Sequence, residues 1–126
     1  MVIIIKFVRS AMLITVMKSK IHRAVVTGTE LHYEGSIAID KTLMKAAKIY
    51  SNEMVQVLNL NNGNRFETYV IEAKKGSGEI SLQGPAARLG HKGDTIIIIS
   101  YCQLQPEEIA NHQPAIIMVD SKNRLK

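Results

Sequence analysis

Residues 55–75 read VQVLNLNNGNRFETYVIEAKK, and this stretch decides the fold. Two strand-like runs, 55–60 and 65–75, are joined by a polar segment that contains Asn62 and Gly63. The Asn62-Gly63 step favours a positive φ, which suits a tight β-hairpin. The stretch therefore predicts two antiparallel strands.

Strand signals continue on both sides of this hairpin. Residues 13–27 are rich in Ile, Val and Thr and end at Gly28, so they predict a long strand with one polar face. The other strand-like segments are SIAID at 36–40, EISLQ at 79–83, DTIIIISYC at 94–102 and AIIMVD at 115–120. We expect the apolar run at 94–102 to be buried on both faces. The residues Gly76-Ser77-Gly78 predict a second hairpin, leading into 79–83.

The clearest helical signal follows Asp40, which can cap a helix over residues 41–50. Its apolar face is formed by Leu43, Met44, Ala46, Ala47 and Tyr50. The opposite face carries Lys41, Lys45 and Lys48. Those lysines form either a solvated helix surface or a binding patch.

The remaining segments add little regular structure. Residues 83–90, QGPAARLG, predict a loop or a single turn, and a short helix begins at Pro106. Six to seven short strands with so few helical residues predict a mainly-β protein, a small barrel with short helices. The length of 126 residues predicts a single domain.

The composition constrains the core and the chemistry. Apolar residues make up 46% of the chain but aromatic residues only 5%, so we expect a core of Ile, Val, Leu, Ala and Met. Cys102 is the single cysteine, which excludes an internal disulfide and predicts a reducing, cytoplasmic location. The four histidines lie far apart in the sequence without an acidic cluster, so we expect no metal site.

Residues 1–11 are apolar and carry Lys6 and Arg9, as targeting segments often do. Their apolar pieces are too short to span a bilayer, and no small-x-small cleavage site follows them. We therefore expect an N-terminal extension, either a β-forming segment or the product of a start site placed before Met12. No membrane association is expected.

Two short motifs are candidates for chemistry. Gly35-Ser36 lies between a polar loop and a strand, where glycine permits a strained backbone, although an isolated Gly-Ser is most simply a turn. In RFETYVI, residues 65–71, alternation places Arg65 and Tyr69 on one face and Thr68 on the other. Arginine can hold a carboxylate and present it beside the phenol, and the alternative is a solvated barrel edge.

Four segments together carry a family resemblance. KIHRAVVT (20–27), LHYEGSIAID (31–40), NNGNRFETYV (61–70) and QGPAAR (83–88) resemble, in order and spacing, the pyruvoyl-dependent aspartate 1-decarboxylases. The resemblance covers residues 12–120. It implies a double-psi β-barrel and a homotetramer with active sites between subunits, with L-aspartate as substrate and no nucleic acid or membrane as partner.

The resemblance also implies self-processing. The precursor is expected to cut itself between Gly35 and Ser36, giving chains of residues 1–35 and 36–126. Ser36 is expected to become a covalently bound pyruvoyl group, which takes the place of pyridoxal phosphate and needs no metal. That group would form a Schiff base with L-aspartate, and loss of CO2 would then give β-alanine for pantothenate and coenzyme A synthesis.

Individual roles follow from the same resemblance. Thr68 matches the residue that stabilises the oxyanion during cleavage, and Tyr69 matches the proton donor of the decarboxylation. The residues that match substrate contacts are Arg65, Lys20 and the turn Gly84, Pro85 and Ala86.

The turn departs from the common family pattern. Where the family commonly has Asn-Gly-Ala-Ala, this chain has Gln83-Gly84-Pro85-Ala86. Proline has no N–H, so a hydrogen bond from position 85 to the substrate has to come from Gly84 or Ala86 instead. Gln83 keeps an amide but reaches one carbon farther than asparagine.

Two other functions compete with this interpretation. The net charge of +5 and the cluster Lys18, Lys20 and Arg23 are compatible with a small basic β-barrel that binds nucleic acid, although stacking aromatics are scarce. A relative that has lost self-processing and has only a structural role is the other alternative. Both Ser36 and Tyr69 are present, which argues against it.

Overall fold

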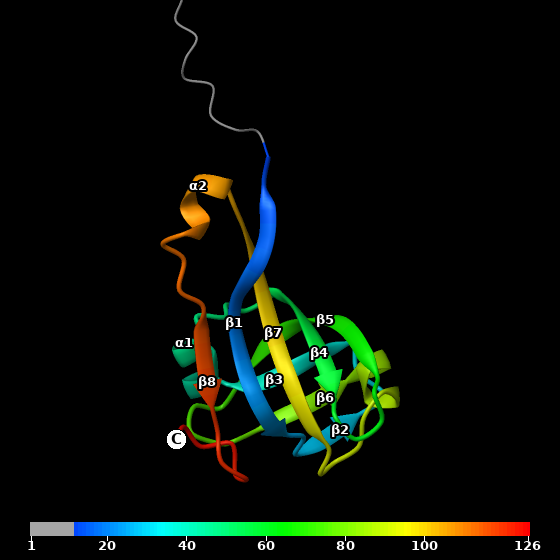
Figure 1. Ribbon diagram of the computed structural model, residues 1–126. Coiled ribbons are helices and arrows are strands. Elements are labelled where there is room, and N and C mark those ends of the chain that lie inside the picture. The colour runs from blue at the N-terminus through cyan, green and yellow to red at the C-terminus, as the bar shows by residue number, and fades with distance from the viewer. Residues whose placement is uncertain (1–11) are drawn as a thin grey trace, which may run out of the picture.

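The computed structural model describes residues 12–126, whose strands form one curled sheet (Figure 1). The elements in chain order are β1 (Ile14–Val25), β2 (Gly28–Glu30), β3 (Ser36–Asp40), α1 (Lys41–Ala47), β4 (Met54–Asn59), β5 (Arg65–Ala73), β6 (Ile80–Gln83), the 3₁₀ turn η1 (Gly84–Arg88), β7 (Thr95–Leu104), α2 (Pro106–Ile109) and β8 (Ala115–Met118). This confirms the mainly-β prediction with short helices. The predicted N-terminal extension, residues 1–11, lies outside the described residues.

The order of strands in the sheet is β2-β6-β3-β5-β4-β7-β1-β8, which makes eight. The additional strand is β2, whose three residues follow directly after the end of the first predicted strand and were not predicted as a strand. The hairpin at Asn62-Gly63 is confirmed, since β4 and β5 pair in antiparallel register and Gly63 has φ +77°. The second hairpin is wrong, because β3 lies between β5 and β6 and pairs with both.

Asp40 caps α1 as predicted, with its carboxylate accepting a hydrogen bond from Thr42 N at 2.8 Å. The helix is shorter than expected and ends at Ala47, because Lys48 adopts a left-handed conformation with φ +58°. The chain then turns Ile49 into the core and leaves Tyr50 72% exposed, so Tyr50 does not belong to the apolar face. The three lysines of α1 and its cap are exposed.

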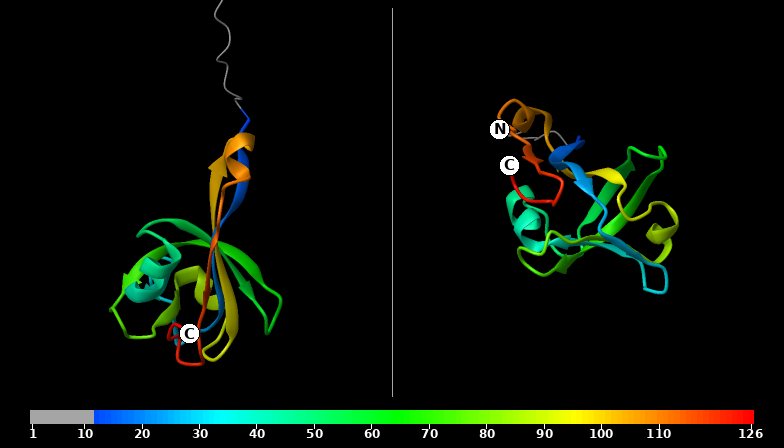
Figure 2. Two further views of the ribbon diagram at one scale, coloured as in Figure 1. Left: turned by 60° about the vertical axis from the view of Figure 1, so that its left-hand side comes forward. Right: turned by 90° about the horizontal axis from the view of Figure 1, so that it is seen from below.

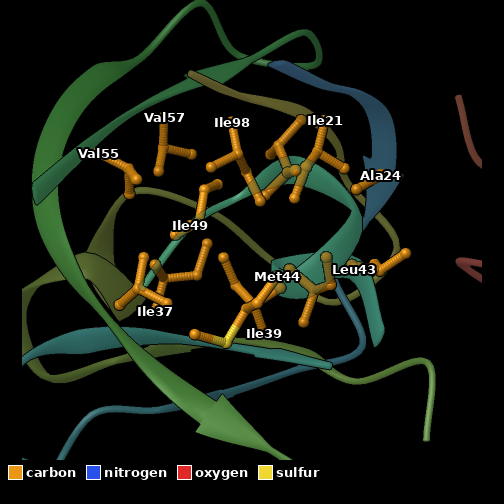
Figure 3. Close-up of a cluster of buried hydrophobic side chains, with 14 of the residues drawn as sticks. Ile21, Ala24, Ile37, Ile39, Leu43, Met44, Ile49, Val55, Val57 and Ile98 are labelled. Atoms are coloured by element: carbon orange, nitrogen blue, oxygen red, sulfur yellow. The ribbon is translucent and has the colours of Figure 1, made fainter. Parts of the chain in front are cut away.

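The core lies inside the curled sheet and is made of the aliphatic residue types that the composition predicts (Figure 3). Side chains from β3, β4 and β7 meet α1 there, and Ile37, Val57 and Ile98 are completely buried. Strand β7 is buried on its inner face only, because Ile97 and Ile99 on the outer face are half-buried. The expectation that this strand is buried on both faces is therefore wrong.

The long strands β1 and β7 continue beyond the barrel as a narrow arm, with α2 beside its end (Figure 2). Their pairing shifts register twice, between Met17 and Ser19 and between Ile21 and Ala24. Within residues 12–126, no helix is long and apolar enough to cross a bilayer.

The end of β3 is held in place by the carboxylate of Asp40, which is 2% exposed. Besides capping α1, it accepts hydrogen bonds from the N–H groups of Gly76 and Gly78, each at 2.8 Å. Burial acts to raise the pKa of Asp40, but the N–H groups of Gly78, Thr42 and Gly76 outweigh it and lower the pKa below its usual value. One charged group thus joins β3, α1 and the turn before β6.

We expect Asp40→Asn to lower the free energy of unfolding at neutral pH by about 2 kcal/mol, because hydrogen bonds to a charged acceptor are lost. Since the pKa of Asp40 is lower in the folded than in the unfolded state, its contribution is complete above the unfolded value of about 4 and is lost as the pH falls through the folded value. Urea titrations of both proteins over that range measure the difference.

The matched control is Asp120→Asn, since N–H groups of Arg124 and Lys122 also lower the pKa of that carboxyl but it lies exposed. We expect its loss of stability to be smaller. Equal losses for the two variants, or a loss for Asp40→Asn that does not shrink in acid, would contradict this account.

Candidate active site

The start of β3 lies beside the middle of β5. The two strands are parallel, with Ile37 opposite Val70. Extending that register by one residue sets Ser36 beside Tyr69, and a second step sets Gly35 beside Thr68. Two motifs that are more than thirty residues apart in the sequence therefore meet at the edge where the pairing of β3 with β5 begins.

A cavity of about 290 Å³ opens at this edge. Its lining includes five residues predicted for the site, namely Gly35, Thr68, Tyr69, Pro85 and Ala86. It also includes four that the sequence did not single out, namely Glu34, Phe66, Glu67 and Leu89. The first three of these are chain neighbours of predicted residues, whereas Leu89 carried no signal. The volume is near the lower end of the range of small-molecule sites, about 300–1,000 Å³.

Ser36 is fully buried at the first position of β3. Its hydroxyl donates a hydrogen bond to Oε1 of Gln83 at 3.0 Å. The preceding residue, Gly35, has φ +109°, a conformation that side chains other than glycine rarely adopt. The peptide bond between them therefore joins a residue whose conformation favours glycine to a nucleophile with a fixed hydrogen bond.

The turn η1 packs directly on the backbone before this bond. A Cβ on Gly84 would lie 2.5 Å from both Cα and N of Gly35 and 2.6 Å from the carbonyl oxygen of Tyr33. A Cβ on Gly35 would in turn lie 3.2 Å from Cδ of Pro85. Glycine at both positions lets the two backbone segments approach closely.

We expect Gly84→Ala to disturb the Gly35-Ser36 bond and to slow any chemistry there, because the added methyl group has no room. The control is Gly63→Ala, since Gly63 also has a positive φ but no atom within 4 Å of an added Cβ. Both variants share the backbone strain, of order 1 kcal/mol. Cleavage rates and urea midpoints of the two variants separate the effect of backbone strain, which both share, from the steric clash with the Gly35 backbone, which only Gly84→Ala has. Equal cleavage rates and equal midpoints would contradict the close packing of Gly84 on Gly35.

Thr68 and Tyr69 lie on opposite faces of β5, as alternation predicts, and yet both line the cavity. No register shift interrupts the pairing of β5 with β4 or with β3, which excludes a bulge. Instead, β3 pairs with β5 only from Val70 onward, so the edge of β5 at residues 68–69 is open. Both side chains border the cavity around that open edge.

Two residues predicted to contact the substrate lie outside the cavity lining. Arg65 is exposed at the start of β5, and Lys20 lies on β1. Two strands separate β1 from β5, which sets their backbones about 14 Å apart as measured along the curled sheet. Neither residue lines the cavity, whose charged lining consists of Glu34 and Glu67.

Chemistry rather than size selects this cavity. A larger hollow of about 570 Å³ lies over α1, among Lys41, Lys45, Lys75 and Leu125. None of the residues that line it belongs to the Gly35-Ser36 bond, to β5 or to η1. In the part of the chain that the structure describes, no group of three or more His, Cys, Asp or Glu side chains could hold a metal ion.

Comparison with known proteins shows the family of the chain. The sequence model of a family described as aspartate decarboxylase matches residues 12–126. A protein of Caldicellulosiruptor bescii named aspartate 1-decarboxylase is 61% identical over 114 residues, which cover 90% of this chain and 89% of the relative. One from Acetivibrio thermocellus with the same name is 59% identical, covering 90% of each chain, and one from Chloroherpeton thalassium is 56% identical, covering 88% and 82%. The chain therefore belongs to the aspartate decarboxylase family.

Proposed function

We propose that this protein is a self-processing, pyruvoyl-dependent enzyme that converts L-aspartate to β-alanine and CO2 for pantothenate and coenzyme A synthesis in the cytoplasm. The observation that carries the proposal is the position of the Gly35-Ser36 bond. Gly35, on the N-terminal side of that bond, lines one small cavity together with Thr68 and Tyr69. Family membership over the whole described chain, residues 12–126, supports the same conclusion.

The first reaction is cleavage of the chain by its own serine. Oγ of Ser36 attacks the carbonyl carbon of Gly35, the C–N bond breaks as an ester forms, and the hydroxyl proton passes to the nitrogen of Ser36. Elimination then breaks the Cα–H and Cβ–Oγ bonds of Ser36, with the Cα proton passing to water, which leaves a carboxylate on Gly35 and a dehydroalanine at position 36. Addition of water and loss of ammonia yield the pyruvoyl group, so the products are residues 1–35 and 36–126.

Thr68 is suited to assist the first step. Its side chain borders the cavity next to Gly35, where negative charge develops on the carbonyl oxygen during the attack. A hydroxyl that donates to this oxygen stabilises the transition state, and the loss of one such donor typically costs about 3–4 kcal/mol.

The residues around position 36 fit the group that cleavage would create. Ser36 supplies its atoms, and the cavity leaves room beside the start of β3 for a small substrate. Once formed, the group would supply a carbonyl able to condense with the substrate amine and to withdraw the electrons released as CO2 departs. No metal or pyridoxal phosphate is required.

Tyr69 is the proposed proton donor. Continuing the register of β3 and β5 by one residue beyond the Ile37–Val70 pair would set it beside position 36, and it is 37% exposed. Its phenol can deliver a proton from Oη to the carbon that loses its carboxylate, after which water releases β-alanine.

The charges of the cavity favour an active site shared between subunits. L-aspartate carries two carboxylates, whereas the cavity's charged lining consists of Glu34 and Glu67. Cations must therefore approach from outside this lining, and Lys20 of a second copy and Arg65 are the proposed sources. The outer surface also exposes Met54, which is 63% accessible and would be covered in the proposed homotetramer.

Co-expression of Lys20→Ala and Ser36→Ala chains tests the shared site. Each variant alone is expected to be inactive, because one lacks the cation and the other lacks the pyruvoyl group. In mixed tetramers, the pyruvoyl group of one chain meets Lys20 of the other, so activity should return. Mixed tetramers without activity would show that Lys20 acts within its own chain or not at all.

The reaction itself is tested with the purified, fully cleaved protein. We expect release of CO2 and formation of β-alanine from L-aspartate, and much less reaction with L-glutamate, which is one methylene longer. Chromatography of the products with isotopically labelled substrate measures both. A fully cleaved protein that forms no β-alanine would overturn the proposed reaction.

A further inference from the structure

We propose that Gln83 is a positioning residue that orients the Ser36 hydroxyl for self-cleavage, an inference that rests on the proposed function. The contact that carries it is the hydrogen bond from Oγ of Ser36 to Oε1 of Gln83, at 3.0 Å. The hydroxyl is fully buried, so its orientation is set by the protein rather than by bulk water.

The sheet places these two side chains together. Strands β3 and β6 are antiparallel, and Ser36 lies directly opposite Gln83 in their register. Directly opposed residues of antiparallel strands have neighbouring side chains on the same face. The residue type at position 83 therefore decides which atom faces the nucleophile.

The amide of Gln83 is not engaged in capping the turn that follows it. Gln83 occupies the N-cap position of η1, but its side chain makes no capping hydrogen bond there. The same turn packs Gly84 against the backbone of Gly35, on the other side of the bond to be cut. Gln83 and Gly84 thus fix the nucleophile and the backbone before it from consecutive positions.

The direction of the hydrogen bond has a chemical consequence. When the hydroxyl donates its hydrogen bond to Oε1 of Gln83, the lone pairs of Oγ are free to approach the carbonyl carbon of Gly35. An amide oxygen cannot take up the proton at neutral pH, so Gln83 orients the hydroxyl without acting as the base. A carboxylate at this position would accept the same hydrogen bond and could also act as a base.

Three variants of the full-length precursor test the inference. Gln83→Met removes the acceptor and keeps much of the side-chain volume, and Gln83→Glu keeps an acceptor. The matched control is Gln56→Met, because Oε1 of Gln56 accepts a comparable hydrogen bond from the Tyr101 hydroxyl at 2.6 Å, away from the scissile bond. Precursors made by cell-free synthesis in the cold are warmed, and the cleaved fraction is followed with time by denaturing mass spectrometry.

We expect Gln83→Met to slow cleavage about five- to tenfold, the effect of losing one neutral hydrogen bond, while Gln56→Met cleaves at the wild-type rate. Gln83→Glu is expected to cleave at least as fast as wild type at neutral pH and to slow in acid as its carboxylate is protonated. A structural role alone would not produce this dependence on pH.

Two results would overturn the inference while leaving the proposed function intact. One is a Gln83→Met precursor that cleaves at the wild-type rate. The other is a Gln83→Glu precursor that is as slow as Gln83→Met at every pH. A wild-type precursor that stays intact would instead overturn the proposed function, and this inference with it.

Discussion

Ser36→Ala is expected to abolish chain cleavage and decarboxylation together. Alanine has no Oγ to attack the carbonyl carbon of Gly35, and no other nucleophile is proposed for this bond. Without cleavage no pyruvoyl group forms, so the activity should fall below detection rather than by a modest factor. Denaturing electrophoresis and a β-alanine assay on the same sample measure both losses.

The control for Ser36→Ala is Ser100→Ala. Ser100 is also completely buried, and its hydroxyl pairs with that of Ser19 at 2.5 Å. Removing it costs a buried hydrogen bond but leaves the bond before Ser36 untouched. We expect Ser100→Ala to be cleaved and active, although less stable by about 1–3 kcal/mol because the other hydroxyl loses its partner. A cleaved Ser36→Ala chain would contradict the assigned nucleophile.

Tyr69→Phe is expected to separate the two reactions. The ring and its packing remain, while the phenolic proton is lost, so cleavage should proceed and turnover should fall. Loss of a positioned general acid typically slows a reaction by about 10²–10⁴-fold. The measurement is kcat per cleaved chain, with the cleaved fraction determined independently.

Tyr101→Phe provides the comparison for Tyr69→Phe. Tyr101 is 40% exposed, close to the 37% of Tyr69, and its hydroxyl donates to Gln56 on the outer face. We expect this variant to retain full turnover. A Tyr69→Phe enzyme that turns over as fast as Tyr101→Phe would refute the proposed proton donor.

Local turn and capping chemistry allowed much of the fold to be predicted. The Asn62-Gly63 turn and the Asp40 cap depend on residues that are neighbours in the sequence, and both lie as expected. The hairpin expected at Gly76-Ser77-Gly78 failed because strand partners are a long-range choice. A turn sequence cannot show that β3 pairs with both flanking strands and separates them.

The end of α1 illustrates a different limit. The residues after Ala47 continue a helical apolar spacing, and Lys48 gives no glycine-like signal for a left-handed cap. Packing of Ile49 into the core decided the break. Similarly, the four consecutive isoleucines of β7 show no alternation of apolar and polar residues, so the sequence does not indicate which face of the strand is the inner one.

For the site, the motifs identified the residues and the fold supplied their arrangement. Alternation predicts that Thr68 and Tyr69 lie on opposite faces of the strand, which alone argues against both side chains belonging to one site. The unpaired edge of β5 at residues 68–69 explains how both can border the same cavity. The contact between Ser36 and Gln83 also depends on the pairing of β3 with β6, which the sequence does not specify. The basic cluster Lys18, Lys20 and Arg23 also gives less support to nucleic-acid binding than it did in the sequence, because Lys18 forms an ion pair with Glu53 at 2.7 Å.

Denaturing mass spectrometry of the purified wild-type protein tests the central claim most directly. We predict two chains, residues 1–35 and 36–126, with the longer one lighter by one ammonia than the same chain beginning with serine. That deficit is the signature of a pyruvoyl group at position 36. A chain that stays intact after prolonged incubation, or a cut chain that begins with ordinary serine, would contradict the account.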